Sequence, residues 1–332
     1  MPWQQRMAVR MRRWARAVTD WAKRVSLPFF DEVPVYNVAV FFWRSIVDGS
    51  ITTRASSIAY NFFLALFPAI LFLFTLIPYI PIPNFQDELF FLIKSIVPES
   101  VFGAVEDTVE DIITRPRGDL LSLGFFMALI FATNGISSIM AAFDATIHSI
   151  NRRKWYSQWM ISVVLLLIQA FLLTLAIALV TGGQKLLDYL MEKSLFFDKF
   201  TYYFFSAGKW VIIVALFFFA YSFLYYMAPA RKSKWRFISA GGSLATMLSI
   251  ILLFGFTYYI NNFSQYNKLY GSIGTLLVVL MLIYLFALVL LIGFELNASI
   301  YQAQQLSNHE DSFYTRMRKQ VEKPEQRNTL NR

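Results

Sequence analysis

Residues 272–296 read SIGTLLVVLMLIYLFALVLLIGFEL, and this stretch decides the fold class. It contains no charged side chain before Glu295. About 20 consecutive apolar residues are enough for a helix to cross the hydrocarbon core of a bilayer. The segment therefore predicts a transmembrane helix, because a helix buried in a soluble core is usually shorter and carries a polar face.

Five more segments have the same character, and the composition agrees with them. The chain is 57% hydrophobic and 15% charged, whereas soluble domains average about 45–50% apolar and about 25% charged residues. We therefore expect an all-α polytopic membrane protein with about six transmembrane helices. The membrane domain spans 35–303, between a basic segment at 1–34 and a polar tail at 304–332 that we expect to be disordered. The other five spans are predicted at 56–78, 120–143, 159–181, 210–228 and 237–260.

The distribution of positive charge predicts the orientation. Of the 30 Lys and Arg residues, 22 lie on one side of the predicted spans, and none lies within a span. Because Lys and Arg are enriched in cytoplasmic loops, we expect both termini in the cytoplasm. The segments on that side are 1–55, 144–158, 229–236 and 297–332.

The basic N-terminal segment favours a helix that lies on the membrane. Trp and other apolar residues recur there at spacings of three and four, and most of the arginines fall elsewhere around the helix. This pattern suits contact with anionic lipid headgroups. A cytoplasmic helix packed on the bundle explains it equally well, and a nucleic-acid arm explains it less well, so no nucleic acid partner is expected. The apolar positions are Trp3, Met7, Met11, Trp14, Val18, Trp21 and Val25.

Four ionisable residues lie at the predicted cytoplasmic ends of the spans: Arg54, Asp144, His148 and Glu295. All four are expected at one depth, so Arg54 could pair with either Asp144 or Glu295. Ionisable groups near the membrane core are costly and often functional. The sequence leaves two interpretations open, namely a gate or binding site, and a cluster that only locks helix ends together; helix-end charges more often do the latter.

Polar residues also occur inside the spans. Asn134, Ser137, Ala141, Asp144 and His148 follow one face of the second predicted helix. That face could line a water-filled path or form a close helix contact.

Two further features are candidates for a polar path and for packing. Asn61 adds an amide to the first span, and Pro68 predicts a kink or break in that helix. Small residues at 239–246 predict tight packing of the fifth span.

A last candidate lies on the outer side of the membrane. Tyr266, Tyr270 and Gly271 precede the sixth span in a predicted outer loop, which is a candidate binding loop.

Enzyme signatures are scarce in the sequence. There is no cysteine, and the two histidines lie far apart, at 148 and 309. A zinc site needs clustered ligands, and no phosphate-binding glycine loop has the required spacing to a lysine. We therefore expect no catalytic residue, no metal and no cofactor, and we expect that the protein is not an enzyme.

Three groups of residues carry a family resemblance. They are RASSIAY at 54–60 with LFP at 66–68, YYMAP at 225–229 with Trp235 and GG at 241–242, and YGSIG at 270–274 with Tyr284 and GFELN at 293–297. In this order they resemble the YihY/virulence-factor BrkB family of bacterial inner-membrane proteins, over most of residues 35–300. Leu282 departs from the pattern, since the family often has Trp there.

The resemblance implies six spans and a role in the cell envelope. It implies transport, lipid or lipopolysaccharide handling, or resistance to host killing. Some members were once called ribonuclease BN, but this sequence offers no ligand cluster for metal-assisted phosphodiester cleavage.

Two hypotheses follow. The first is a transporter-like or lipid-translocating protein, in which Asn61, Asn134, Ser137 and Asp144 line a path and Arg54 and Glu295 form a cytoplasmic gate. The second is a membrane scaffold that recruits envelope partners. Membrane lipids are the expected partners, and a homo-oligomer is compatible with the sequence.

Overall fold

The computed structural model is helical over nearly all of the residues that it describes. These are residues 19–23, 25–26, 30, 33–48, 50–80, 86–87, 90, 94, 106, 110–111, 115–147, 153–192, 199–230, 236–262 and 264–329. Within them, side chains are not described at 48, 180–181, 183–207, 209, 261–273, 275 and 308–329.

Six helices are long and apolar enough to cross a membrane, which confirms the prediction from hydropathy. Many of their large apolar side chains are exposed, such as Phe171 (66%) and Leu173 (63%). Water would not tolerate so much apolar surface, and lipid solvates it. The candidate spans are Ile51–Tyr79, Gly118–Thr146, Trp155–Leu179, Trp210–Met227, Ala240–Ile260 and Leu276–Ser307.

The spans belong to helices that in several cases extend further. The first span joins α3 (Ile51–Leu76) to a short 3-10 helix, η1 (Ile77–Tyr79). A kink or break was predicted at Pro68. The helix does not break there, since α3 continues through that residue. The others are α6 (Gly118–Thr146), α7 (Trp155–Glu192), α8 (Lys199–Met227), α9 (Ala240–Asn262) and α10 (Ser264–Thr329).

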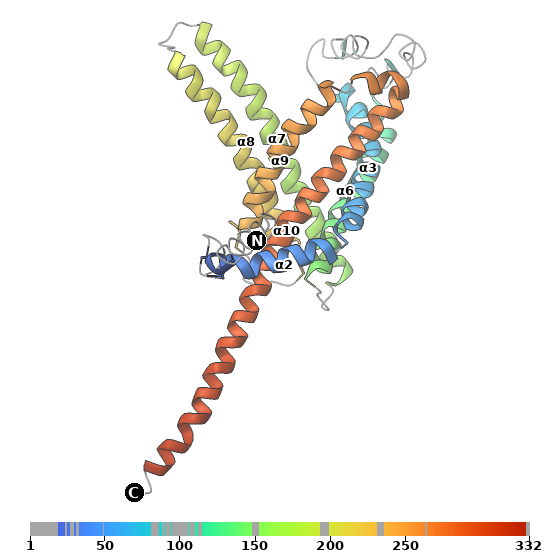
Figure 1. Cartoon of the computed structure of the whole chain (residues 1–332). Coiled ribbons are helices and arrows are strands. Elements are labelled where there is room, and N and C mark those ends of the chain that lie inside the picture. The colour runs from blue at the N-terminus through green and yellow to red at the C-terminus, as the bar shows by residue number, and fades with distance from the viewer. Residues whose placement is uncertain are drawn as a thin grey trace, which may run out of the picture.

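The last helix, α10, is the central element of the bundle (Figure 1). It packs against α9, α3 and α2, while α3 pairs with α6 and α7 pairs with α8. Helices α3, α7 and α9 begin, and α6 and α8 end, at one end of the bundle. We call it the basic end. From there, α7 and α8 diverge from α3 and α6 (Figure 1).

An aromatic core joins α6, α8 and α10 near the basic end. The rings of Phe143 and Phe294 stack with centroids 3.8 Å apart and planes 8° from parallel. Tyr225 packs edge-on against Phe143, at 5.7 Å between centroids, and its hydroxyl donates to the Leu290 carbonyl at 2.7 Å. All three rings are at most 1% exposed. Burial of such rings dominates the packing energy of a core.

Two glycines bring the backbones of α9 and α10 together. A Cβ added at Gly241 would lie 2.0 Å from the Gly293 carbonyl oxygen, and a Cβ at Gly293 would lie 2.7 Å from the Gly241 carbonyl oxygen. Ala245 continues this contact one turn further along α9. The prediction that small residues at 239–246 serve tight packing is therefore confirmed.

One helix of the structure, α2 (Val35–Asp48), has no counterpart among the predicted elements. It lies crosswise to the spans at the basic end (Figure 1). Its Val38 is buried with Ile300 and Ala303 of α10. After α2 the chain turns at Ser50, which adopts a left-handed conformation with φ 48° and ψ 36°. This conformation disfavours residues with a Cβ by about 1–2 kcal/mol, so packing of α2 on α10 must hold it.

Two predictions of irregular structure were wrong. The expected outer loop with Tyr266, Tyr270 and Gly271 forms the first turns of α10, and the side chains of these three residues lie outside the described ones. The tail after residue 304, expected to be disordered, is helical through Thr329. Extending an existing helix needs no new nucleus, so polar segments at either end of the apolar span can continue it. Most of the predicted interfacial helix at 3–25 lies outside the described residues.

Candidate functional site at the basic end

A buried ion pair joins α3 to α10 at the basic end. A terminal guanidinium nitrogen of Arg54 lies 2.6 Å from Glu295 Oε1. The side chains are 12% and 1% exposed, respectively. Arg54 lies one turn into α3, and Glu295 lies where α10 passes that turn, so crossing of the two helices creates the contact.

Two hydroxyl groups complete this site. Thr146, the last residue of α6, accepts a hydrogen bond from Arg54 and donates one to Glu295 Oε1 at 2.9 Å. Ser45 of α2 donates to Glu295 Oε2. Arg54 also donates to the Ala142 carbonyl oxygen at 3.0 Å. We call Ser45, Arg54, Thr146 and Glu295 the Arg54 cluster; its members come from four different helices.

The hydrogen bonds decide how this cluster affects stability. Desolvating a carboxylate and a guanidinium costs several kcal/mol each, and Coulomb attraction offsets that cost only when the remaining donors and acceptors are satisfied. Here both Glu295 oxygens accept hydrogen bonds from protein groups. Losing one partner would leave the other charge buried, which costs about 3–5 kcal/mol.

Asp144 belongs to a separate contact. The sequence left open whether Arg54 pairs with Asp144 or Glu295, and the structure selects Glu295. Asp144 Oδ1 accepts a hydrogen bond from the backbone N–H of Ala230 at 2.8 Å. It thereby ties the end of α6 to the connection that follows α8.

Arg153 caps the same region from the start of α7. Its guanidinium donates to the carbonyl oxygens of Met227, Ala228 and Pro229, which a helix end leaves without intrahelical partners. Burial lowers the pKa of Arg153 from its ordinary value, and the charge of Asp144 opposes this shift. Arg153 lies in the predicted basic segment 144–158, and nothing in its sequence neighbours predicts contact with the end of α8.

The predicted polar face of α6 is divided among its neighbours. Ser137 Oγ lies 3.0 Å from Ser162 Oγ of α7. Asn61 of α3 donates to Ser138 Oγ at 2.8 Å. Asn134 is exposed, and His148 lies outside the described residues. The contacts that the structure describes for this face therefore join α6 to neighbouring helices. Of the two interpretations, a water-filled path and a close helix contact, they correspond to the second.

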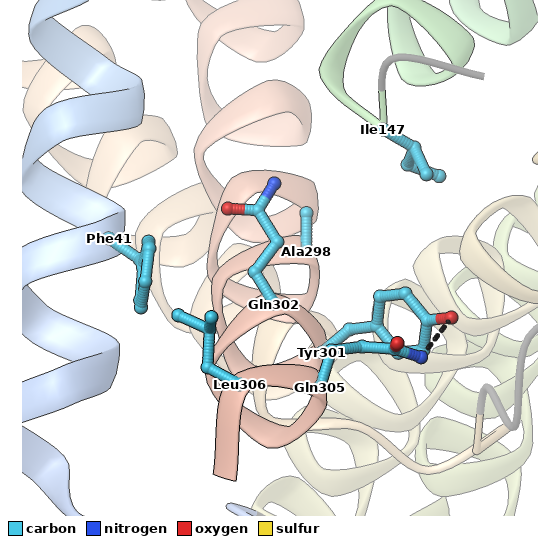
Figure 2. A pocket seen from close by; sticks show the side chains of 7 residues that line it. All are labelled: Phe41, Ile147, Ala298, Tyr301, Gln302, Gln305 and Leu306. Atoms are coloured by element: carbon cyan, nitrogen blue, oxygen red, sulfur yellow. Dashed lines mark hydrogen bonds between the residues drawn. The ribbon is translucent and has the colours of Figure 1, made fainter. Parts of the chain in front are cut away.

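A cavity of about 350 Å³ lies beside the Arg54 cluster, between α2, the end of α6 and α10. Figure 2 shows Phe41 on one side and Ile147 on another, with α10 residues between them. Gln305 donates to the Tyr301 hydroxyl at 2.8 Å. Thr146 precedes Ile147, and Ala298 lies about one turn after Glu295, so cavity and cluster share the same helix ends. The lining residues are Phe41, Ile147, Ala298, Tyr301, Gln302, Gln305 and Leu306.

The GFELN segment at 293–297 contributes to most of these contacts. Gly293 allows the approach of α9, Phe294 stacks in the aromatic core, and Glu295 forms the ion pair. Asn297 accepts from the backbone N–H of Gly241 at 2.8 Å and donates to Ser239 at 3.0 Å. In the part of the chain that the structure describes, no three His, Asp or Glu side chains gather as a metal site would require.

Comparison with known proteins identifies the family. Residues 42–314 match the family described as Virulence factor BrkB. The chain belongs to this family. The BrkB-family match covers every described span and the whole Arg54 cluster.

Individual relatives of this BrkB-family chain share between 26% and 31% identity with it over the matched residues. The ribonuclease-like protein YfkH of Bacillus subtilis is 28% identical over 258 residues, which cover 76% of this chain and 91% of YfkH. A UPF0761 membrane protein of Idiomarina loihiensis is 31% identical over 169 residues, covering 50% of this chain and 58% of that protein. One from Xanthomonas axonopodis is 26% identical over 305 residues, covering 88% of this chain and 65% of that protein. No solved structure matches the chain. The family and the six spans together make this a multi-pass membrane protein.

Proposed function

We propose that this BrkB-family protein is transporter-like, or that it translocates or handles envelope lipid, in a bacterial inner membrane with both termini in the cytoplasm. The observation that carries the proposal is the Arg54 cluster, which joins four helices beside a cavity at the basic end. A buried ion pair so close to the membrane core is costly, and ionisable groups inside membrane proteins often belong to substrate or ion pathways.

The cluster is suited to act as a gate. Breaking the bond between Arg54 and Glu295 would release α3 from α10 and would free the carboxylate toward the neighbouring cavity. Two arrangements of one polar network, each with its own set of partners, are what a switch between states requires. Asp144 and Arg153 hold the adjacent helix ends in place during such a change.

The experiment is reconstitution into vesicles that carry fluorescent phospholipid, with dithionite added to bleach the outer label. We expect the wild type to expose inner-leaflet label to bleaching. Glu295→Gln removes the charge but keeps the shape of the side chain, and we expect at least about a tenfold slower rate, equivalent to about 1.4 kcal/mol. Tyr221→Phe is the control, because it removes an equally buried hydrogen bond, to Ser249, away from the cluster.

Either of two results would contradict this proposal. The wild type could leave the inner label protected, with or without an imposed ion gradient. Alternatively, Glu295→Gln and Tyr221→Phe could translocate lipid at the same rate as the wild type, and the cluster would then serve only to lock the four helices together.

We further propose that the protein is not an enzyme, and that it interacts with anionic lipid headgroups rather than nucleic acid and can self-associate. The relative YfkH is named ribonuclease-like. A ribonuclease here would require divalent-metal-dependent RNA cleavage by the purified chain, with activity that follows the protein peak through chromatography. Detection of that activity would overturn the proposal.

The alternative function is a scaffold for envelope partners, and one observation favours it. Beyond the last span, which ends at Ser307, α10 continues to Thr329 and projects from the bundle (Figure 1). Deleting residues 308–332 separates the two functions. A scaffold loses its partners, whereas a translocator keeps its rate in vesicles.

A further inference from the structure

Helix α2 is apolar on two opposite faces. One face packs on α10 through Val38, and its Ser45 reaches Glu295. Val40, Trp43 and Val47 lie about 170° away from that face, at 100° per residue. Their exposed fractions are 47%, 70% and 65%. We call Val40, Trp43 and Val47 the outer stripe of α2.

The position of α2 along the bundle indicates what covers the outer stripe. The last span begins at Leu276, and a hydrocarbon core of about 30 Å takes about 20 residues of helix, so the core ends near residue 296. α2 crosses α10 at Glu295, Ile300 and Ala303. It therefore lies at the boundary between the hydrocarbon core and the headgroups.

Aromatic residues elsewhere mark the same level. Trp155 and Trp159, in the first turns of α7 at the basic end, are 79% and 50% exposed. Exposed Trp side chains gather at the two membrane interfaces. Trp43 belongs to the same belt, and the exposed Arg44 follows it at the edge of the outer stripe, where a cation can meet lipid phosphate.

We propose that α2 is an interfacial helix whose outer stripe is immersed in the phospholipid of the bilayer. This assignment does not depend on lipid translocation. Burying such a stripe at the boundary between headgroups and acyl chains removes apolar surface from water without breaking backbone hydrogen bonds, because the helix lies in the plane of the interface.

The absence of native cysteine allows a direct test. Single-cysteine variants Val40→Cys, Trp43→Cys and Val47→Cys would carry an environment-sensitive fluorophore in vesicles of phosphatidylcholine and phosphatidylglycerol. Nitroxide on the lipid headgroup or acyl chain and aqueous iodide would then be compared as quenchers. Asn37→Cys is the matched control, because Asn37 is exposed on the same helix about 90° from the outer stripe. Arg115→Cys gives an aqueous reference, since the Arg115 side chain is 76% exposed.

We expect nitroxide lipids to quench all three labels, with headgroup nitroxide the most effective. Iodide quenching should be at least about fivefold weaker than for the Arg115 label, and weaker than for the Asn37 label. Iodide quenching equal to that of the Arg115 label would overturn the proposal. Protection from iodide without lipid quenching, together with a cross-link between two Trp43→Cys chains, would also overturn it, because a second copy would then cover the stripe. Three independent positions keep the test valid if one variant fails to fold.

Discussion

Gly241→Ala tests the closest helix contact in the protein. The added methyl group would lie 2.0 Å from the Gly293 carbonyl oxygen and 2.6 Å from Asn297 Cγ. Non-bonded heavy atoms prefer about 3.5–4.0 Å, and a backbone carbonyl cannot rotate away. The substitution must therefore push α9 away from α10.

The magnitude follows from what that separation breaks. Overpacking costs about 1–3 kcal/mol. Moving α9 also weakens the hydrogen bonds of Asn297 to Gly241 and Ser239, each of which contributes about 1 kcal/mol. Alanine favours a helix more than glycine does, but Gly241 is near the start of α9, where helix propensity matters little. The higher propensity of alanine therefore offsets little of the loss. We expect a loss of about 3 kcal/mol in the free energy of unfolding.

Gly255→Ala is the matched control on the same helix. Nothing lies within 4 Å of a Cβ added there, and Ala in a helix interior gains up to about 1 kcal/mol over Gly. The assay is reversible unfolding in SDS, followed by circular dichroism. If Gly241→Ala unfolds at the same SDS fraction as Gly255→Ala, the two helices do not touch as described and the reasoning is refuted.

Three further substitutions test the buried contacts in the same unfolding assay. Arg54→Ala should lower the free energy of unfolding by about 3–5 kcal/mol, because Glu295 is left as an unpaired buried charge. The Arg54→Ala/Glu295→Ala double variant should recover part of this loss. If the losses of the two single variants add up in the double variant, the two residues are not coupled. Asp144→Asn should keep the free energy of unfolding within about 1 kcal/mol of the wild type, because the amide oxygen still accepts from Ala230, whereas Asp144→Ala should lose about 1–3 kcal/mol. Equal losses in the two variants would mean that the hydrogen bond to Ala230 does not stabilise the fold. Phe294→Ala should cost about 3–5 kcal/mol from the aromatic core, and a loss below about 1 kcal/mol would contradict the stacking.

The conflict between two expectations for Asp144 can be resolved by these measurements. A path residue should lose activity in Asp144→Asn while keeping its stability. A residue that only accepts from Ala230 should keep both in Asp144→Asn and lose stability in Asp144→Ala. Measuring unfolding and lipid bleaching on the same preparations distinguishes the two roles.

The sequence by itself determined the six spans. Crossing a bilayer depends on length and hydropathy, which are local properties of a segment, and 272–296 shows both without any tertiary contact. The same local logic found the small residues of α9. It failed at 266–271 and in the tail, because polar composition there suggested irregular structure while helix continuation from α10 decided the outcome.

Only the tertiary structure decided which polar groups meet. Arg54 had two carboxylates at the predicted depth, and the crossing of α3 and α10 selected Glu295. Ser45 and Thr146 carried no signal in the sequence, since hydroxyl residues near helix ends are common and their roles depend on a neighbour about 250 and about 150 residues away, respectively. The outer stripe of α2 likewise became visible only once its other face was seen against α10. Span formation is a property of one segment in lipid, whereas a buried ion pair is a property of how several segments cross.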